Sequence, residues 1–134
     1  MIVSEVKLGH VEEYKKIITK EDVKLFAKAT GDFNPVHLDA DFAANTMFKK
    51  PIAHGMLSGS LFSTIFGTIY PREGSIYLKQ SLTFIKPVYI DEELTVKAEV
   101  IRIDEAKKYV YFATTATDTT GDVVCKGEAV IYLP

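Results

Sequence analysis

Residues 51–70 read PIAHGMLSGSLFSTIFGTIY and contain no Asp, Glu, Lys or Arg. This stretch is long enough to cross a bilayer, but its glycines, its serines and threonines, and His54 make it too polar for a membrane span. A helix that is apolar on all sides is typical of the interior of a water-soluble fold. We therefore expect a buried central helix over residues 55–70 and no membrane span.

The sequence that follows this helix predicts a sheet. After Pro71 and Gly74, apolar and polar residues alternate with period two to the end of the chain, which favours strands over 76–84, 94–101, 109–118 and 123–133. Hairpin-sized turns over 104–107 and 119–122 join the last three strands into an antiparallel meander. Residues 12–18 add a charged strand at a sheet edge. One antiparallel sheet of about five strands wrapped around one apolar helix is an α+β fold.

Short helices are expected between the edge strand and the apolar stretch. Thr19, with Asp22 three residues on, predicts an N-cap, and Gly31 is the residue type that ends a helix in the left-handed conformation. Residues 32–35, Asp-Phe-Asn-Pro, then predict an ordered loop, because a residue before proline disfavours helix and Asx side chains favour turns. Asp39 predicts the N-cap of a second short helix that carries Phe42 and Ala43.

Composition limits the class of protein. The 134 residues fit one domain over 1–134, and 47% hydrophobic residues supply a core. A formal net charge of −2 without a basic run gives no reason to expect nucleic acid or a membrane surface as a partner. The single cysteine, Cys125, excludes a disulfide scaffold, and no signal peptide precedes the first strand. We expect a cytoplasmic protein.

A helix that contacts a sheet on one side only leaves apolar side chains uncovered on its other side. For the helix over 55–70 we expect Phe62, Ile65, Phe66 or Ile69 to be partly exposed. A second copy of the chain or a bound apolar ligand would then cover them.

The candidate chemistry lies in one loop. Three histidines and one cysteine without a metal-binding spacing give no zinc motif, and no phosphate-binding loop or serine-nucleophile elbow is present. In Gly31–His37, GDFNPVH, a carboxylate at Asp32 and an imidazole at His37 lie five residues apart, with Asn34 between them. Such a pair converging on one water performs general acid–base chemistry without a cofactor. The residues alone equally allow Asp32 to cap a turn and His37 to be an ordinary loop residue.

His54-Gly55 marks the start of the apolar helix. Backbone N–H groups in a first helical turn have no partner within the helix, and the helix dipole adds partial positive charge there. The N–H of Gly55 could therefore polarise a thioester carbonyl and stabilise an enolate-like oxygen. The alternative is that Gly55 only permits close packing.

These segments resemble a known family. Residues 26–37, FAKATGDFNPVH, with Ala43 six residues later, resemble the hydratase-2 motif of the MaoC-like, (R)-specific enoyl-CoA hydratases. Residues 51–57, PIAHGML, resemble the family's helix start, and residues 80–84, QSLTF, with 87–88, PV, resemble its first long strand. Chain length and element order match the short members that supply polyhydroxyalkanoate synthesis.

The resemblance implies a hot-dog fold, a homodimer, and reversible syn hydration of a trans-2-enoyl-CoA to the (R)-3-hydroxyacyl-CoA. It implies no metal and no cofactor apart from the coenzyme A of the substrate. Asp32 and His37 match the acid/base pair, although the sequence does not settle which one takes the proton from water. Asn34 matches a supporting residue and Gly55 the oxyanion donor. Ser63 and Phe66 are candidate walls of the acyl pocket, and Gln80 is a second candidate supporting residue.

Three alternatives stay open. Hot-dog acyl-CoA thioesterases share the fold, but hydrolysis does not require an acid and an imidazole on this loop. Dehydration of 3-hydroxyacyl chains on acyl carrier protein is the same chemistry on another carrier. A non-catalytic acyl-CoA-binding protein would have no use for a pair that activates water.

Overall fold

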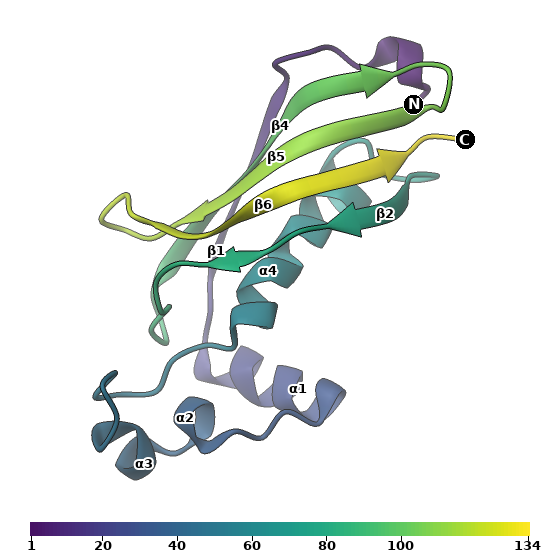
Figure 1. Ribbon diagram of the computed structural model, residues 1–134. Helices are drawn as coiled ribbons and strands as arrows, with labels where there is room; N and C mark the ends of the chain where they lie inside the picture. The colour runs from purple at the N-terminus through teal and green to yellow at the C-terminus, as the bar shows by residue number, and fades with distance from the viewer.

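The computed structural model describes residues 1–134, which form six strands and four α-helices (Figure 1). A short 3-10 helix, Val3–Glu5, precedes them, and a π-helical turn, Ile65–Ile69, continues α4. The elements in chain order are β1 Val11–Ile17, α1 Lys20–Thr30, α2 Pro35–Leu38, α3 Ala40–Ala44, α4 Gly55–Thr64, β2 Ile76–Gln80, β3 Thr83–Phe84, β4 Glu93–Asp104, β5 Tyr109–Thr117 and β6 Val123–Tyr132.

All strands pair antiparallel in one sheet with the order β1-β4-β5-β6-β2, and β3 also pairs with β6. The meander of the last three strands and the edge position of β1 are confirmed. The strand expected over 76–84 is instead two pieces. At Ser81 the hydroxyl, rather than the backbone carbonyl, accepts from the Glu128 N–H at 2.9 Å, which interrupts the regular ladder. The Ser81 carbonyl lies where a side chain on Gly127 would stand. This close approach of Ser81 to β6 therefore requires glycine at position 127.

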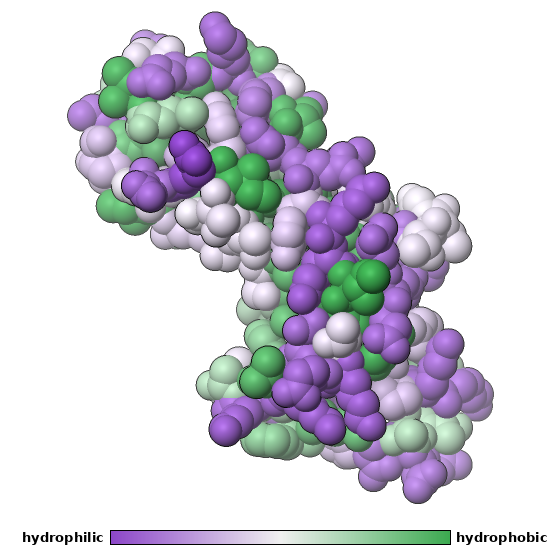
Figure 2. All heavy atoms as spheres, turned by 180° about the vertical axis from the view of Figure 1, so that it is seen from behind, coloured by the Kyte–Doolittle hydropathy of each residue, from purple (hydrophilic) through white to green (hydrophobic).

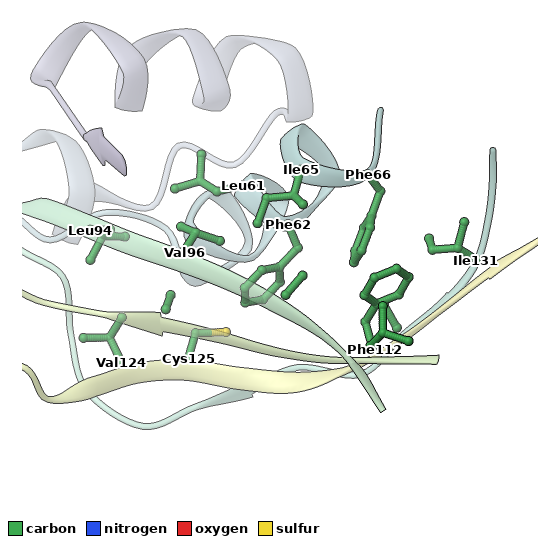
Figure 3. Packing of buried hydrophobic residues seen from close by; sticks show 14 of the residues in the cluster. Leu61, Phe62, Ile65, Phe66, Leu94, Val96, Phe112, Val124, Cys125 and Ile131 are labelled. Atoms are coloured by element: carbon green, nitrogen blue, oxygen red, sulfur yellow. The ribbon is translucent and has the colours of Figure 1, made fainter. Parts of the chain in front are cut away.

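The α4 helix packs along the sheet and forms the core, as the sequence predicts (Figure 3). Leu61 lies on the side of the helix next to Leu25 and Phe26 of α1, whereas Phe62, Ile65 and Phe66, from the helix and its π-helical continuation, point toward the sheet (Figure 3). Their partners there are Leu94, Val96, Phe112, Val124, Cys125 and Ile131. Burying apolar side chains on both surfaces supplies the main driving force for this arrangement.

The expectation that apolar residues of this helix stay partly exposed is wrong for three of the four named. Phe62 and Ile65 are 0% exposed and Phe66 is 2% exposed, while Ile69 is half-buried. All three lie on the sheet-facing side, and the opposite side of the helix carries Met56 and Ser60. Uncovered apolar surface lies instead on β2, where Ile76, Tyr77 and Leu78 are 47%, 37% and 43% exposed.

Helices α1, α2 and α3 gather at one end of the sheet (Figure 1), and a narrower waist separates this end from the sheet when the molecule is seen from behind (Figure 2). The predicted capping box of α1 is confirmed: the Thr19 hydroxyl accepts from the Asp22 N–H, and the Asp22 carboxylate accepts from the Thr19 N–H. Gly31 ends α1 with φ of 84°. Asp39 caps α3 as expected.

The loop predicted over residues 32–35 is correct only as far as Asn34. Pro35 begins the four-residue helix α2, because proline fits the first helical position, where no backbone N–H is needed. His37 therefore stands on a helical turn. None of the helices combines the length and the apolar character needed to cross a membrane.

Candidate active site

A cavity of about 420 Å³ opens at the start of α4 and brings distant segments together. Asp32, His37 and Gly55 all line it, so the structure unites the three residues that the sequence singles out. The opposite wall comes from residues 84–88, which begin with the last residue of β3, and from Val124 and Cys125 of β6. The chemistry-bearing side chains thus come from the helical end, and most of the apolar wall comes from the sheet.

Two consecutive Asx turns build the acidic side of the site. The Asp32 carboxylate accepts from the Asn34 N–H at 3.2 Å, and the Asn34 side-chain oxygen accepts from the Val36 N–H at 3.2 Å. The first bond uses Oδ1 of Asp32 and fixes the carboxylate against its own backbone. The second makes Asn34 the N-cap of α2. This short run of sequence therefore sets the path from Asp32 to His37.

His37 is held by the backbone carbonyl of Ile52, three residues before α4 begins. Its Nδ1 lies 2.8 Å from the carbonyl oxygen of Ile52. A carbonyl only accepts, so Nδ1 carries the hydrogen and, in the neutral ring, Nε2 keeps its lone pair. Burial lowers the pKa of His37 below its usual 6.5, and the nearby His54 lowers it further, while the Ile52 carbonyl and the Asp32 charge oppose this. The neutral, proton-accepting form of His37 is favoured near neutral pH.

Gly55 is the first residue of α4, and its N–H donates to no backbone or side-chain acceptor. The N-cap His54 offers no side-chain cap to the first turn. The phenyl ring of Phe84 lies against Gly55: a Cβ added there would stand 3.0 Å from two of its ring carbons. A free N–H together with the helix dipole is suited to a developing oxyanion, and this role of Gly55 stays a prediction.

Two side chains of the cavity are not identified from the sequence as site residues. His54 is 2% exposed and donates from Nε2 to the Asp32 carbonyl oxygen at 3.0 Å. Ser58, also 2% exposed, lies one turn into α4. Nδ1 of His54 and Oγ of Ser58 have no hydrogen-bond partner. Their signal in the sequence is the position of two polar residues at the start of a helix without charged residues.

The remaining predicted site residues do not line this cavity in the single chain. Asn34 acts on it through the capping bond. The Gln80 amide is bonded to Tyr77, Thr114 and the Ser81 carbonyl. Ser63 is exposed, and Phe66 is buried with its ring centroid 4.7 Å from that of Phe112. The roles of Gln80, Ser63 and Phe66 stay predictions.

An ion-pair network holds the apolar wall in place. The Lys86 ammonium lies 2.7 Å from Oδ2 of Asp118 and 2.9 Å from Oδ2 of Asp122, at the turn between β5 and β6. The other Asp118 oxygen accepts from Thr120 and from the Asp122 N–H. These bonds hold the pKa of the buried Asp118 carboxyl well below its usual range. The segment 84–88 is therefore tied to the hairpin next to it.

Asp32, His37 and His54 each offer one candidate metal-ligand atom, all within 4.8 Å of one another. The ligands of a tetrahedral zinc ion stand about 2.0–2.3 Å from the metal, hence roughly 3.3–3.8 Å apart. Nε2 of His54 carries the hydrogen that it donates to a carbonyl, so only its Nδ1 has a free lone pair. A spread of 4.8 Å is wider than a tetrahedral zinc ion requires, and the geometry suits proton transfer between the carboxylate and His37 better than metal coordination.

A family model described as the MaoC like domain matches residues 4–122 of the chain. The chain belongs to the MaoC-like family. The motif that carries the resemblance, residues 26–37, lies within the matched range, and its Asp32 and His37 are the residues that share the cavity.

Individual proteins of this family are similar to the chain over most of its length. This MaoC-like chain is 41% identical over 134 residues to an (R)-specific enoyl-CoA hydratase of Aeromonas caviae, with all of both chains covered. A solved structure of an A. caviae (R)-hydratase involved in PHA biosynthesis superposes with a TM-score of 0.94 at 42% identity, covering 96% of this chain and 98% of that one. A mitochondrial 3-hydroxyacyl-[acyl-carrier-protein] dehydratase of Arabidopsis thaliana is 36% identical, covering 96% of this chain and 78% of the relative. The hot-dog fold is thereby confirmed.

Proposed function

We propose that the protein is a hydro-lyase, an (R)-specific enoyl-CoA hydratase that reversibly adds water to trans-2-enoyl-CoA. The observation that carries the proposal is the shared cavity of Asp32, His37 and the unpaired Gly55 N–H. A carboxylate and an imidazole placed together can activate a water, and an N–H at a helix start can stabilise the charge that forms on a thioester oxygen. No residue of this arrangement needs a cofactor to do so.

The reaction follows from the geometry. The thioester oxygen accepts a hydrogen bond from the Gly55 N–H, which withdraws electrons from the conjugated double bond. A water held between Asp32 and Nε2 of His37 loses a proton to the pair, and its oxygen bonds to C3. The electron pair of the double bond moves toward the thioester, giving an enolate-like oxygen at Gly55. The pair then returns a proton to C2 from the same side, so addition is syn.

The test uses crotonyl-CoA with purified protein and no added metal or nucleotide. We expect loss of the conjugated-enoyl absorbance, and a dehydrogenase specific for (R)-alcohols should oxidise the product. Asp32→Asn and His37→Gln should each lower kcat by about a hundredfold or more while circular dichroism stays unchanged. Release of free thiol without hydration would identify a thioesterase, and binding without turnover would identify an acyl-CoA-binding protein.

The carrier is tested in the same assay. We infer that the coenzyme A thioester is the substrate, in line with the activity for which the A. caviae relative is named. A crotonyl thioester of acyl carrier protein is the competitor, since the A. thaliana relative is named for action on that carrier. A higher kcat/KM with the carrier protein would overturn the choice of coenzyme A.

A cytoplasmic location fits a free, buried thiol at Cys125.

We further infer that two copies form a homodimer. The β2 strand is at the edge of the sheet and combines unpaired backbone groups with exposed Ile76, Tyr77 and Leu78. The cavity wall residues Phe84 and Ile85 are each 51% exposed, and Asp32 is exposed at the rim. A second copy over this side would cover the apolar edge and keep bulk water from the reaction.

Light scattering after size exclusion tests the assembly. The wild-type protein should have twice the mass of one chain. Leu78→Asp should shift the mass toward one chain, whereas Leu8→Asp, which alters a 66%-exposed leucine near the N-terminus, should leave the mass unchanged. A monomeric wild-type protein would contradict the inference.

A further inference from the structure

His54 contacts both Asp32 and His37 and has no role in the reaction derived above. It directly precedes Gly55 and α4, yet its side chain does not cap the helix. It is 2% exposed, so it does not contact bulk water. Its contacts are instead with the two residues of the acid/base pair.

The first contact fixes the backbone at Asp32. Nε2 of His54 donates to the Asp32 carbonyl oxygen at 3.0 Å, across 22 positions of sequence. The carboxylate of Asp32 is in turn fixed to the same short stretch of backbone through the Asn34 N–H. The His54 hydrogen bond therefore anchors this loop to the start of α4, where Gly55 presents its N–H.

The second contact supports the imidazole of His37. The two histidine rings have centroids 3.9 Å apart with planes tilted by 30°. The ring of Phe26, from α1, packs on His54 with centroids 4.8 Å apart. The ring of His54 therefore supports one face of the His37 ring and is itself held by Phe26. The Ile52 carbonyl holds the Nδ1 edge of His37.

We propose that His54 is a positioning residue for the hydration reaction: its Nε2–H holds the Asp32 loop and its ring supports His37, so that carboxylate and imidazole converge on one water. The inference rests on the proposed hydratase function and adds to it a residue that does not contact the reacting atoms. It also explains how residues from two separate segments keep one relative geometry.

The unpaired Nδ1 of His54 argues against a purely space-filling role. A buried acceptor without a partner costs free energy. An apolar side chain could fill this space with no such cost. What a histidine adds at this position is the Nε2 donor, and that donor serves only the Asp32 carbonyl.

The ionisation of His37 reports on this arrangement. Burial lowers the pKa of His37 most, His54 lowers it further, and the Asp32 charge and the Ile52 carbonyl raise it. Lys20 and Lys50 line a second cavity of about 230 Å³ on which His37 also borders. If His54 is replaced by a side chain that cannot be protonated while these other groups stay, the pKa of His37 should rise, and the acid limb of the pH profile should move to higher pH.

Two variants separate the ring from the donor. His54→Phe keeps a ring beside His37 and removes the donor, and we expect kcat for crotonyl-CoA to fall about tenfold or more, KM to change less than threefold, and the acid limb to move up. His54→Gln restores an N–H donor, and we expect it to recover most of the lost kcat. The control Phe26→Leu trims the ring behind His54, and should lower Tm without moving the acid limb.

The outcomes distinguish this inference from the proposed function. A wild-type protein that does not hydrate crotonyl-CoA would overturn the function before any variant is compared. With an active wild type, wild-type kcat and pH profile in His54→Phe would overturn the positioning role. If His54→Phe does not fold, His54→Leu, which also lacks the donor, is compared with His54→Gln. A lower kcat in His54→Leu than in His54→Gln supports the role, and equal kcat in the two variants overturns it.

Discussion

Nδ1 of His37 donates to the carbonyl of Ile52 at 2.8 Å, and the Ile52 N–H donates to the Val36 carbonyl at 3.3 Å. The segment Val36–His37 is therefore bonded in both directions to Ile52, in the strand-like segment before α4: through the His37 ring in one direction and through the Val36 backbone in the other. This pairing orients Nε2 of His37 and leaves it without a protein partner. It also brings the helix α2 against the segment that leads to Gly55.

The first prediction concerns pH. The buried environment lowers the pKa of His37 below 6.5, so protonation that removes the Nε2 lone pair occurs only in more acidic solution. We expect kcat/KM for crotonyl-CoA to be constant around neutral pH and to fall below about pH 6.5. A titration of the His37 ring by NMR should give the same midpoint. A midpoint above 6.5 would contradict the assignment.

The second prediction tests the capping bond of α2. Asn34→Ala leaves the Val36 N–H without its acceptor and should cost about 1 kcal/mol of stability. Because α2 carries His37, kcat should also fall, by about tenfold. Asn34→Ser keeps an oxygen that can cap the helix, and it should retain most of both properties. Urea unfolding and steady-state rates, measured on the same samples, check this pair.

The third prediction concerns the contact between Gly55 and Phe84. In Gly55→Ala the added Cβ would stand 3.0 Å from the Phe84 ring. That ring is half-exposed and can swing away, so the fold should survive, while the apolar wall over the oxyanion site is displaced. We expect KM for crotonyl-CoA to rise several-fold. Combining Gly55→Ala with Phe84→Leu should relieve part of the conflict; strictly additive effects of the two changes would show that the residues do not interact.

The fourth prediction concerns Ser58. Its hydroxyl is buried and unpaired, so Ser58→Ala removes an unsatisfied polar atom and should stabilise the fold by roughly 0.5–1 kcal/mol. Since no step of the reaction uses this oxygen, kcat should stay within about threefold. A lowered Tm would show that the hydroxyl has a partner in solution, such as a bound water.

The fifth prediction concerns stability in acid. The bonds from Lys86 and Thr120 depress the pKa of Asp118, so its contribution is complete above the unfolded value near 4 and is lost progressively as the pH falls below that value. Asp118→Asn should destabilise the protein at pH 7 by about 1–3 kcal/mol and flatten this acid dependence. The control Asp122→Asn alters a 63%-exposed carboxylate and should have a much smaller effect.

Much of this architecture could be predicted from the sequence, because the relevant signals are local. The charge-free helix, the period-two strands, and the caps at Thr19 and Asp39 each depend on neighbouring residues. The break at Ser81 could not be predicted, because it depends on Gly127 in another strand. The exposure of β2 could not be predicted for the same reason: strand order, which decides which strand is at the edge, is a long-range property.

In the candidate site, too, the residues with local sequence signals could be predicted and those that depend on long-range contacts could not. Asp32, Asn34 and His37 can be found from the sequence because they lie within six positions and share one turn chemistry. His54 does not stand out as a site residue, because its importance comes from a carbonyl 22 positions earlier. The tie from Lys86 to Asp118 spans 32 positions and follows no motif. Ser63, Phe66 and Gln80 rest on expectations about helix and strand faces, and no contact joins them to this cavity.

The two walls of the cavity meet at one backbone bond, from the Ala53 N–H to the Val88 carbonyl at 2.8 Å, but their side chains have different supports. This has a consequence for how such a protein can change over generations. The reactive groups are fixed by turns, a cap and two backbone carbonyls within the helical end, whereas residues 84–88 are fixed by the Lys86 network and the sheet. Substitutions in 84–88 can therefore reshape the space for an acyl group without disturbing proton transfer. Selection for a new substrate can act on one wall while the chemistry of the other is inherited intact.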